Sequence, residues 1–566
     1  MPVKKILKFL LGIPMVVLLL LIVFNNKQLK SQIFGAIKYR DFEITPGNIA
    51  VPYERTLEWK KESAFADSIC QVFADLPITN EMLLRKGSTT RILLARLMLK
   101  QNVPEVNEII KKMTVWGNCG SSWSMNLKGD YDFPLTILTT IFWKFGDQPD
   151  LIYPETKEHL LNVLLSEDGG NFSYTTPKTL GLLFETENHM LMTEGSRYLK
   201  NRWIRQHGNS DSYYDNVQNG MEEKLLSLMG EMKINGLYEF NSIPYLGYTI
   251  TALLNLEAFA SEKVSQTARD VLDYINWSYA LSSLNLKHYP PMRRRYEKAN
   301  IKELTSDYHS AFIKSWLSYS EIGNYDKNVG AGGRHALMGA CMPYRPSDRF
   351  VEMLFEKGNG YFVRQGHGPK ACPEISSAGK KFLISAGGVN RGKKSRIVAR
   401  PICLFLDDTS DHLSEIFHLS GPGDNFMKWN NTGVYKNFAC AAGSVIVPEH
   451  MQAVAQSGNW SLYSGGKGVT IVTYAADSLG IMTAFEEVDS SAIFEEIVKE
   501  NSNPELLKSQ FKFPNGLLLK YNVKAKKNQW VMVSENDQKL NRNFDSWPLI
   551  EGEIYKEDDE RDLLRI

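Results

Sequence analysis

The chain has 566 residues, of which 43% are hydrophobic and 23% are charged, and this composition is that of a folded globular protein. With 65 basic and 64 acidic residues the formal net charge is +1, so bulk charge does not favour nucleic-acid binding, and we predict no nucleic-acid partner. The length exceeds one ordinary domain, which predicts at least two large domains.

The N-terminal stretch predicts a membrane anchor. Lys4, Lys5 and Lys8 precede an uncharged, leucine-rich run at 9–24, which approaches the length of a membrane-spanning helix when residues 6–8 are included. No small-residue cleavage site follows the run and no cysteine is placed to accept a lipid, so an uncleaved anchor is favoured over a removed signal peptide. We therefore predict a transmembrane signal anchor at 1–30, with the bulk of the chain exported to the periplasmic or extracellular side.

Helical periodicity dominates from about residue 55 to 345. Apolar residues recur with i, i+3, i+4 spacing at 93–99, 106–113, 135–142, 225–229, 248–259 and 264–275. Loops rich in Gly, Asn, Ser and Pro separate these segments, and no fixed-period repeat is present. The pattern predicts an all-α domain at 31–345, built from helical hairpins as a solenoid or a closed toroid.

The pattern changes near residue 350. Short segments rich in β-branched and aromatic residues follow, bounded by turn residues, at 361–363, 381–386, 469–474, 480–485 and 517–523. They predict an antiparallel β-sandwich domain at 346–566. The predicted fold class is therefore an α+β multidomain protein with an N-terminal membrane anchor.

The cysteines do not predict a metal site. Six are present, far apart, and none has the CxxC or Cys/His spacing of a zinc site, so we predict no metal. Their even number permits disulfides in an exported protein, but free buried thiols are equally compatible with the spacing. The six are Cys70, Cys119, Cys341, Cys372, Cys403 and Cys440.

The polar centre of the helical region is the pair Asn188–His189. It offers an amide donor and a titratable imidazole within a carboxylate-rich stretch, which suits holding a carboxylate and moving a proton. Tyr245 follows a proline at a predicted helix entrance, where its phenol could donate or accept a proton. The alternatives are a hydrogen-bonded core histidine and a structural tyrosine. Tyr248 has the spacing of a packed helix face, and it is also a candidate substrate contact.

Further candidates could line a cleft. Arg293 and Arg294 follow a Pro-Pro turn, and guanidinium groups there could bind a carboxylate or sulfate or simply form a solvated basic loop. Trp116 and Trp123 flank a Gly-rich loop, where their indole faces could stack on sugar rings. Asp130 and Asp132 stand at a predicted helix start, where they would most simply be caps.

The Asn188–His189 pair, the later Tyr245 and the order of a helical region before a β region resemble the polysaccharide lyases of the α/α-toroid type, the alginate lyase and heparinase II/III-like group. The resemblance implies β-elimination on a uronic-acid-containing polysaccharide without a cofactor. It implies that Asn188 and His189 neutralise the substrate carboxylate and that Tyr245 acts as acid and base. Fixed donors are required because the α-proton of a free carboxylate is too weakly acidic to remove.

Two alternatives remain beside the lyase hypothesis. Glycoside hydrolysis on the same scaffold could use an acid and base pair drawn from Glu185, Glu187, Glu194, Asp130 and Asp132. A non-catalytic glycan-binding envelope protein could retain the cleft without turnover. In all three cases the predicted partners are a polysaccharide, acidic for the lyase, and a membrane at the N-terminal segment.

Overall fold

The computed structural model describes most of the chain beyond residue 56. The described residues are 57–79, 88–117, 119–120, 130–177, 181, 184–237, 242, 245–288, 308–365, 374–387, 401–406, 415–419, 430–526, 529–540, 550–555 and 561–565.

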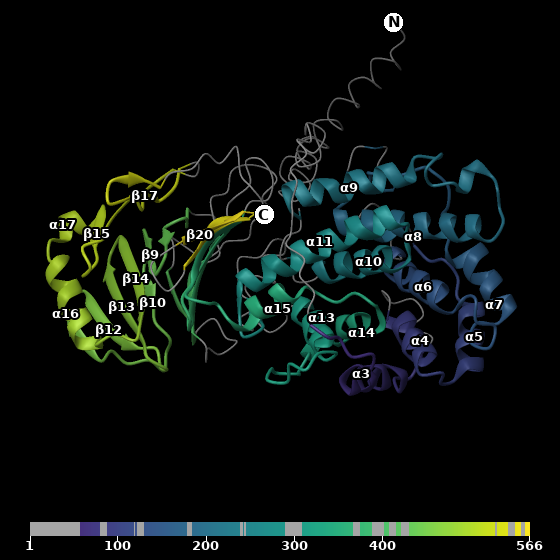
Figure 1. Ribbon diagram of the computed structural model, residues 1–566, viewed down its shortest axis with the longest axis horizontal. Coiled ribbons are helices and arrows are strands. Elements are labelled where there is room, and N and C mark those ends of the chain that lie inside the picture. Colours follow the sequence, from purple (N-terminus) through teal and green to yellow (C-terminus); the bar gives the residue numbers. More distant parts are fainter. Residues whose placement is uncertain are drawn as a thin grey trace, which may run out of the picture.

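Helices make up most of the described chain before residue 356, on the right in Figure 1. The α-helices are α3 (Ala64–Ala74), α4 (Ser88–Met98), α5 (Val103–Lys112), α6 (Asp132–Phe145), α7 (Pro154–His159), α8 (Glu187–Gln206), α9 (Met221–Asn235), α10 (Leu246–Phe259), α11 (Glu262–Leu281), α13 (Tyr308–Leu317), α14 (Gly333–Cys341) and α15 (Asp348–Phe355). Shorter turns are η2 (Leu160–Leu164), η3 (Ser212–Tyr214) and η4 (Gly330–Gly332).

The residue pattern of each helix determines its depth in the fold. Helices α4, α6 and α10 are buried along nearly their whole length; α6 and α10 are mostly apolar, whereas α4 also buries Arg91 and Arg96. Helices α5 and α15 instead bury one face and expose the other. Ends follow local chemistry: the Ser63 hydroxyl accepts a hydrogen bond from the Ala66 amide and starts α3, and Pro104 lies in the first turn of α5.

The inner helices pack in sequence. Helix α4 packs on α6, α6 on α8, α8 on α10, α10 on α13, and α13 on α14, which also packs against α4. Helix α3 lies outside this series and contacts both α4 and α14. The series brings residues from opposite ends of the helical region into one neighbourhood.

The strands form four antiparallel sheets among the described residues. The small hairpin β1 (Ser283–Leu284) and β2 (Lys287–His288) lies within the helical region. An eight-stranded sheet has the order β10-β7-β6-β5-β4-β3-β19-β20, a six-stranded sheet the order β11-β12-β13-β14-β9-β8, and a four-stranded sheet the order β15-β16-β17-β18. The bounds are β3 (Tyr361–Gln365), β4 (Glu374–Ala378), β5 (Phe382–Gly387), β6 (Ile402–Leu406), β7 (Phe417–Leu419), β8 (Val434–Tyr435), β9 (Phe438–Ala441), β10 (Val445–Ile446), β11 (Ala455–Ser457), β12 (Trp460–Ser464), β13 (Val469–Ala476), β14 (Leu479–Glu486), β15 (Gln510–Lys512), β16 (Leu518–Tyr521), β17 (Met532–Glu535), β18 (Gln538–Lys539), β19 (Ile550–Tyr555) and β20 (Arg561–Arg565), with helices α16 (Ser490–Glu500) and α17 (Pro504–Leu507) between β14 and β15.

The eight-stranded sheet is shared by two hydrophobic cores. In β3, Tyr361 and Val363 belong to the core of the helices, whereas Phe362 belongs to the core between the large sheets. Two polar contacts reinforce the junction: the Tyr361 hydroxyl donates to the Leu281 carbonyl at 2.9 Å, and Lys357 Nζ donates to the Ala280 carbonyl at 2.7 Å. Because alternate residues of a strand point to opposite faces, this sheet is covered on both sides.

Two parts of the predicted fold class need correction. The all-α toroid followed by a β-sandwich is wrong as a description, because the structure is a mixed α+β fold with four antiparallel sheets, one of them inside the helical region. The membrane and transmembrane-helix prediction also gains no support, because within the described ranges no helix has the length and hydropathy to cross a bilayer. The predicted anchor at 1–30 lies outside those ranges.

Candidate functional site

The first turns of several inner helices meet around Tyr248. Asp132, at the start of α6, contacts His189 at the start of α8. The Phe133 ring packs edge-on against the rings of His189 and Tyr248, with centroid separations of 5.7 and 4.3 Å. Tyr248, in the first turn of α10, lies 5.6 Å from the His335 ring in the first turn of α14. Helix N-termini present unpaired amide N–H groups and a positive partial charge, so their convergence favours an anion.

Two arginines lie beside the same phenol. The guanidinium carbons of Arg91, in the first turn of α4, and of Arg334, in α14, are 5.8 and 5.7 Å from the Tyr248 ring centroid. Arg334 is also 4.8 Å from the ring of Tyr308, which begins α13. Burial and the neighbouring Arg334 lower the pKa of Arg91 to about 10, so Arg91 stays protonated at neutral pH. Six helix starts and two guanidinium groups thus meet here, beside the carboxylates of Asp132, Asp130 and Glu185 that act on His189; we call the neighbourhood of the two arginines the positive centre.

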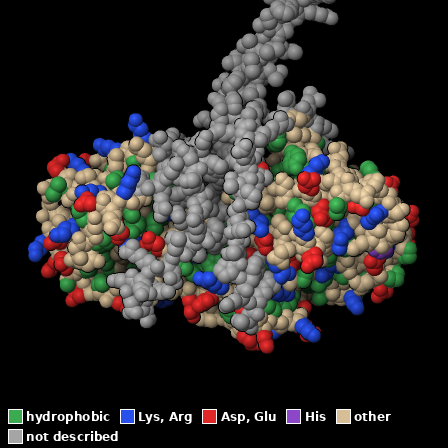
Figure 2. All heavy atoms as spheres, turned by 45° about the horizontal axis from the view of Figure 1, so that its top comes forward, with side chains coloured by type: hydrophobic (Ala, Val, Ile, Leu, Met, Phe, Trp, Pro, Cys, Tyr) green, Lys and Arg blue, Asp and Glu red, His purple; other side chains and the backbone are tan. Residues whose placement is uncertain are grey.

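The positive centre lies inside the protein. On the visible face of the molecule, acidic and basic side chains are interspersed over both halves (Figure 2), as the near-zero net charge leads one to expect. Arg91 is 2% exposed. An anion attracted to this centre would therefore interact with charges that are weakly screened by solvent.

Asp132 and His189 form a buried ion pair. His189 Nδ1 contacts a carboxylate oxygen of Asp132, which is fully buried. Burial raises the pKa of Asp132 to about 6, against the opposing effect of His189. Burial lowers the pKa of His189, but the carboxylates of Asp132 and Glu185 outweigh it, and the net pKa rises to about 9. At neutral pH the pair is therefore imidazolium and carboxylate, with Asp132 fixing the orientation of the ring.

Asn188 carries an unsatisfied amide. Its side chain is fully buried, and its Oδ1 accepts a hydrogen bond from the Thr186 hydroxyl at 2.5 Å. Its Nδ2 has no hydrogen-bond partner among the residues that the structure describes. A buried donor without a partner is costly, and a ligand oxygen would remove that cost.

His335 is a neutral imidazole packed among aromatic rings. It is fully buried, and its ring centroid lies 4.8 Å from that of Tyr308 and 5.3 Å from that of Phe312. Burial first, and then Arg91 and Arg334, hold the pKa of His335 well below its ordinary range. Within the described part of the chain neither ring nitrogen has a hydrogen-bond partner. His335 is thus a neutral base whose ring centroid lies 5.6 Å from that of Tyr248.

Close packing holds His335 in place from the α10 side. A Cβ atom added to Gly247 would lie 2.4 Å from His335 Cε1 and 2.7 Å from Nδ1. Real Cβ contacts are essentially never that short, so only glycine fits at this helical position while the ring stays where it is. Gly247 therefore permits the approach of α10 to α14.

The structure brings some of the sequence-predicted residues together and not others. Asn188, His189 and Tyr248 belong to the group described above. Tyr245 is half-buried at the N-cap of α10, and its carbonyl accepts the amides of Tyr248 and Thr249 at 3.0 and 3.2 Å. Trp116 lies in the helical core, edge-on to the Tyr131 ring at 6.1 Å, and is 5% exposed. Arg293, Arg294 and Trp123 lie outside the described residues.

Sequence reasoning missed three members of the group, because Arg91, Arg334 and His335 were not singled out. Asp132 was interpreted as a helix cap or as a candidate acid or base of a hydrolase, and its pairing with His189 was not predicted. The sequence held one usable signal, because Arg334 and His335 directly follow the run Gly330-Ala331-Gly332-Gly333 and so stand where a helix begins. Nothing local to Arg91 distinguishes it from Arg96, which bonds backbone carbonyls and Glu105 instead.

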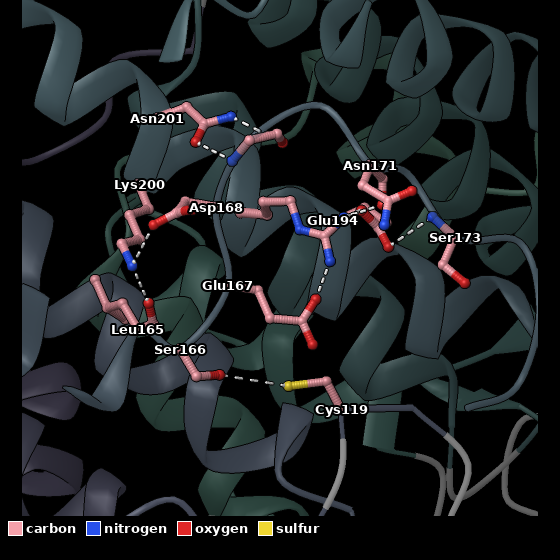
Figure 3. Close-up of polar contacts among 12 residues, drawn as sticks. Cys119, Leu165, Ser166, Glu167, Asp168, Asn171, Ser173, Glu194, Lys200 and Asn201 are labelled. Carbon is pink, nitrogen blue, oxygen red and sulfur yellow. Dashed lines mark hydrogen bonds and ion pairs between the residues drawn. The ribbon is translucent and has the colours of Figure 1, made fainter. Parts of the chain in front are cut away.

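A polar network fixes helix α8 behind the site. Figure 3 shows α8 side chains reaching toward the segment 165–173. Lys200 Nζ donates to the Leu165 carbonyl at 2.6 Å, and Asn201 exchanges two hydrogen bonds with the backbone of Gly169, at 2.8 and 3.2 Å. Glu194 accepts the Ser173 amide at 3.1 Å, and burial raises the pKa of Glu194 to about 8.

Arg197 completes this network. It pairs with Glu194 at 3.0 Å and also contacts Glu167 and the Asn171 carbonyl. Four side chains of α8, at positions 194, 197, 200 and 201, are thus tied to the facing segment about two to four turns after Asn188. The network holds α8 against the facing segment.

Comparison with known proteins adds no assignment. No protein-family model matches the chain, and no curated protein matches it. The functional proposal therefore depends on the residues of the site.

Proposed function

We propose that this protein is a polysaccharide lyase that cleaves a uronic-acid-containing polysaccharide by β-elimination. The observation that carries the proposal is the partnerless amide of Asn188 beside the protonated His189, at a point where helix N-termini meet. Such a site suits a carboxylate, because it offers a hydrogen-bond donor, a cation and a favourable dipole together. Arg91 and Arg334 increase the positive potential of the same neighbourhood.

The residues divide into two roles. Asn188 and His189 would bind the C5 carboxylate and stabilise the negative charge that builds on its oxygens as the C5 proton leaves. Tyr248 and His335 would move protons: a base takes the C5 proton, the C4–C5 double bond forms, the C4–O bond breaks, and an acid protonates the leaving oxygen. The contacts favour Tyr248 over Tyr245 for the acid role, because the guanidinium carbons of Arg91 and Arg334 and the His335 ring centroid all lie within 6 Å of the Tyr248 ring centroid.

Product analysis distinguishes the proposal from its alternatives. The full chain would be incubated with a panel of uronate polysaccharides, such as alginate, pectate, hyaluronan and chondroitin sulfate, and with a neutral glucan as a control. The expected result is an ultraviolet-absorbing unsaturated sugar end on at least one uronate polymer and none on the glucan. New reducing ends without ultraviolet absorbance would show hydrolysis, and binding without turnover would show a glycan-binding protein. Either result would refute the lyase proposal.

The site assignment has its own test. Tyr248→Phe removes one hydroxyl and is expected to lower the rate at least ~100-fold, the usual contribution of a positioned proton donor. Tyr213→Phe is the matched control, because Tyr213 is 51% exposed and bonds Asp168 away from the site. If Tyr248→Phe folds and keeps full activity while Tyr245→Phe loses it, the acid belongs to Tyr245 and the assignment to Tyr248 fails.

A further inference from the structure

Arg334 is a partly buried arginine without a counter-ion. Its Nε atom is buried and has no hydrogen-bond partner, and no carboxylate of the described residues lies within ion-pair distance of its guanidinium group. Other buried or partly buried arginines of the helical region differ: Arg197 and Arg269 each pair with a glutamate, and Arg345 donates to two backbone carbonyls. A guanidinium group presents five N–H donors, so leaving them unpaired away from water costs free energy.

Two tyrosine rings hold the Arg334 side chain. Its guanidinium carbon lies 4.8 Å from the ring centroid of Tyr308 and 5.7 Å from that of Tyr248. Tyr308 begins α13, Arg334 lies in the first turn of α14, and these two helices pack side by side (Figure 1). A Cβ atom added to Gly332, just before α14, would lie 2.6 Å from the Ala311 Cβ atom, so glycine permits this close approach. The side chain is therefore held in place by packing rather than by hydrogen bonds.

The start of helix α14 adds to this positive charge. The N-cap residue of α14 is Gly332, which has no side chain to bond the first amide groups, so the first turn carries the partial positive charge of a helix N-terminus. His335 in the same turn is fully buried, and neither of its ring nitrogens has a hydrogen-bond partner among the described residues. An oxyanion accepts hydrogen bonds from guanidinium groups, helix amides and imidazole N–H groups, so it matches all three features.

Ring contacts connect Arg334 to the proposed carboxylate site. Arg334 lies beside the Tyr248 ring, whose centroid is 4.3 Å from that of Phe133. The Phe133 ring centroid is in turn 5.7 Å from that of His189. The imidazolium of His189 and the guanidinium of Arg334 are therefore two cations of one neighbourhood. A polymer that carries acidic groups on more than one sugar can contact both of them.

We propose that Arg334 binds a second anionic group of the polysaccharide, on a sugar other than the one whose C5 carboxylate Asn188 and His189 bind. The group is a carboxylate or a sulfate ester, because both present oxygen atoms that a guanidinium fork can bond in pairs. The identity of the ligand rests on the proposed lyase function, whereas the anion site itself does not. Polymers with closely spaced acidic groups are then the preferred substrates.

Inorganic sulfate tests the anion site without a substrate. The full chain is melted in increasing sodium sulfate, with sodium chloride adjusted to keep the ionic strength constant. Sulfate is expected to raise the Tm of the wild-type chain in a saturable way, by about 3–6 °C at about ten times its Kd. Arg334→Gln should lose this shift and Arg334→Lys, which keeps the charge without the fork, should reduce it.

The control is Arg349→Gln, which should keep the full shift. Arg349 is an exposed arginine of α15, and its guanidinium carbon lies 5.8 Å from the Trp277 ring centroid. Sulfate also stabilises proteins by exclusion from their surface, but this effect does not saturate and is common to all the chains. A wild-type chain without a saturable sulfate shift would overturn the proposal, as would an equal shift in Arg334→Gln.

Kinetics on the cleaved polymers identify the bound group and separate the two proposals. Arg334→Gln is expected to raise KM about 10–100-fold, as for a lost hydrogen bond to a charged group. A rise on chondroitin sulfate but not on desulfated chondroitin identifies a sulfate ester, and a rise on alginate or on both chondroitins identifies a carboxylate. An unchanged KM on every cleaved polymer overturns the role of Arg334 and leaves the lyase proposal standing. If the wild-type chain cleaves no uronate polymer, the lyase proposal fails, and the sulfate measurement still decides whether the anion site exists.

Discussion

Gly247→Ala should damage both stability and the proposed site. The new methyl group would begin 2.4 Å from His335 Cε1 and 2.8 Å from Nε2, well inside van der Waals contact. His335 has no free direction in which to move, because its ring is fully buried among Tyr248, Tyr308 and Phe312. The substitution therefore forces either the ring or helix α10 to shift.

Two terms of opposite sign set the size of the effect. Alanine is favoured over glycine within a helix by about 1 kcal/mol, whereas overpacking a filled core costs about 1–3 kcal/mol. Gly230→Ala in α9 isolates the first term, because nothing lies within 4 Å of its Cβ position. Gly195→Ala in α8 is a buried control, since its Cβ would meet Leu256 at an ordinary 3.6 Å. The difference between Gly247→Ala and the controls is thus the steric cost alone.

Thermal unfolding and activity together provide the assay. Gly247→Ala is expected to melt roughly 2–10 °C below Gly230→Ala, given about 2–4 °C per kcal/mol for large domains. It should also lose activity on the substrate that the wild-type chain cleaves, while Gly195→Ala keeps it. If Gly247→Ala melts as high as the two controls and stays active, the close approach of α10 to His335 is refuted.

Three further outcomes are expected. Asn188→Leu removes a buried Nδ2 group that has no partner, together with an Oδ1 atom that accepts from Thr186, so it should abolish activity with little change in Tm. Asn201→Leu on the same helix breaks two hydrogen bonds to Gly169 and should cost about 1–3 kcal/mol in denaturant unfolding. The pKa of His189 is raised to about 9 in the folded protein, so its stabilising effect is complete below the unfolded pKa of about 6.5 and is lost as pH rises through 9. The difference in Tm between the wild-type chain and His189→Gln should therefore shrink over that pH range. A constant difference would contradict the ion pair. Asp489→Ala removes the N-cap of α16, which accepts the amides at 491 and 492, and should cost about 1 kcal/mol of stability with no change in activity.

The local pattern of the sequence predicted individual elements better than their assembly. The apolar period at 248–259 and the β-branched and aromatic segments at 469–474 and 480–485 lie within α10, β13 and β14. The number of sheets was not predictable in the same way, because pairing between strands such as β3 and β19 joins segments almost 190 residues apart, as Val363 opposite Gly552 shows. The residue content of a segment indicates that a strand exists, and it leaves the partner of that strand undetermined.

The site was predictable only where its chemistry was local. Asn188 and His189 are adjacent in sequence, and two unlike polar groups at a helix start were visible as a candidate. Their partner Asp132 stands 57 positions away and has the sequence features of an ordinary cap. His335 and Arg91 reach the site through the packing of α14 and α4, which no local spacing encodes. When a site is assembled from the starts of several helices, the sequence can indicate its residues only singly. Which of these residues lie together becomes known only from the fold.

The double coverage of the eight-stranded sheet also determines how this protein can be divided. Because β3 contributes Tyr361 and Val363 to one core and Phe362 to the other, a cut near residue 346 would leave the helices with an uncovered apolar surface and the sheets with a bare face. The two halves are therefore poor candidates for separate expression or for transfer as independent modules. If recombination exchanged the β region, the new eight-stranded sheet would have to fit the helices on one face and the six-stranded sheet on the other. The evolution of the β region is therefore tied to that of the helices that carry the site.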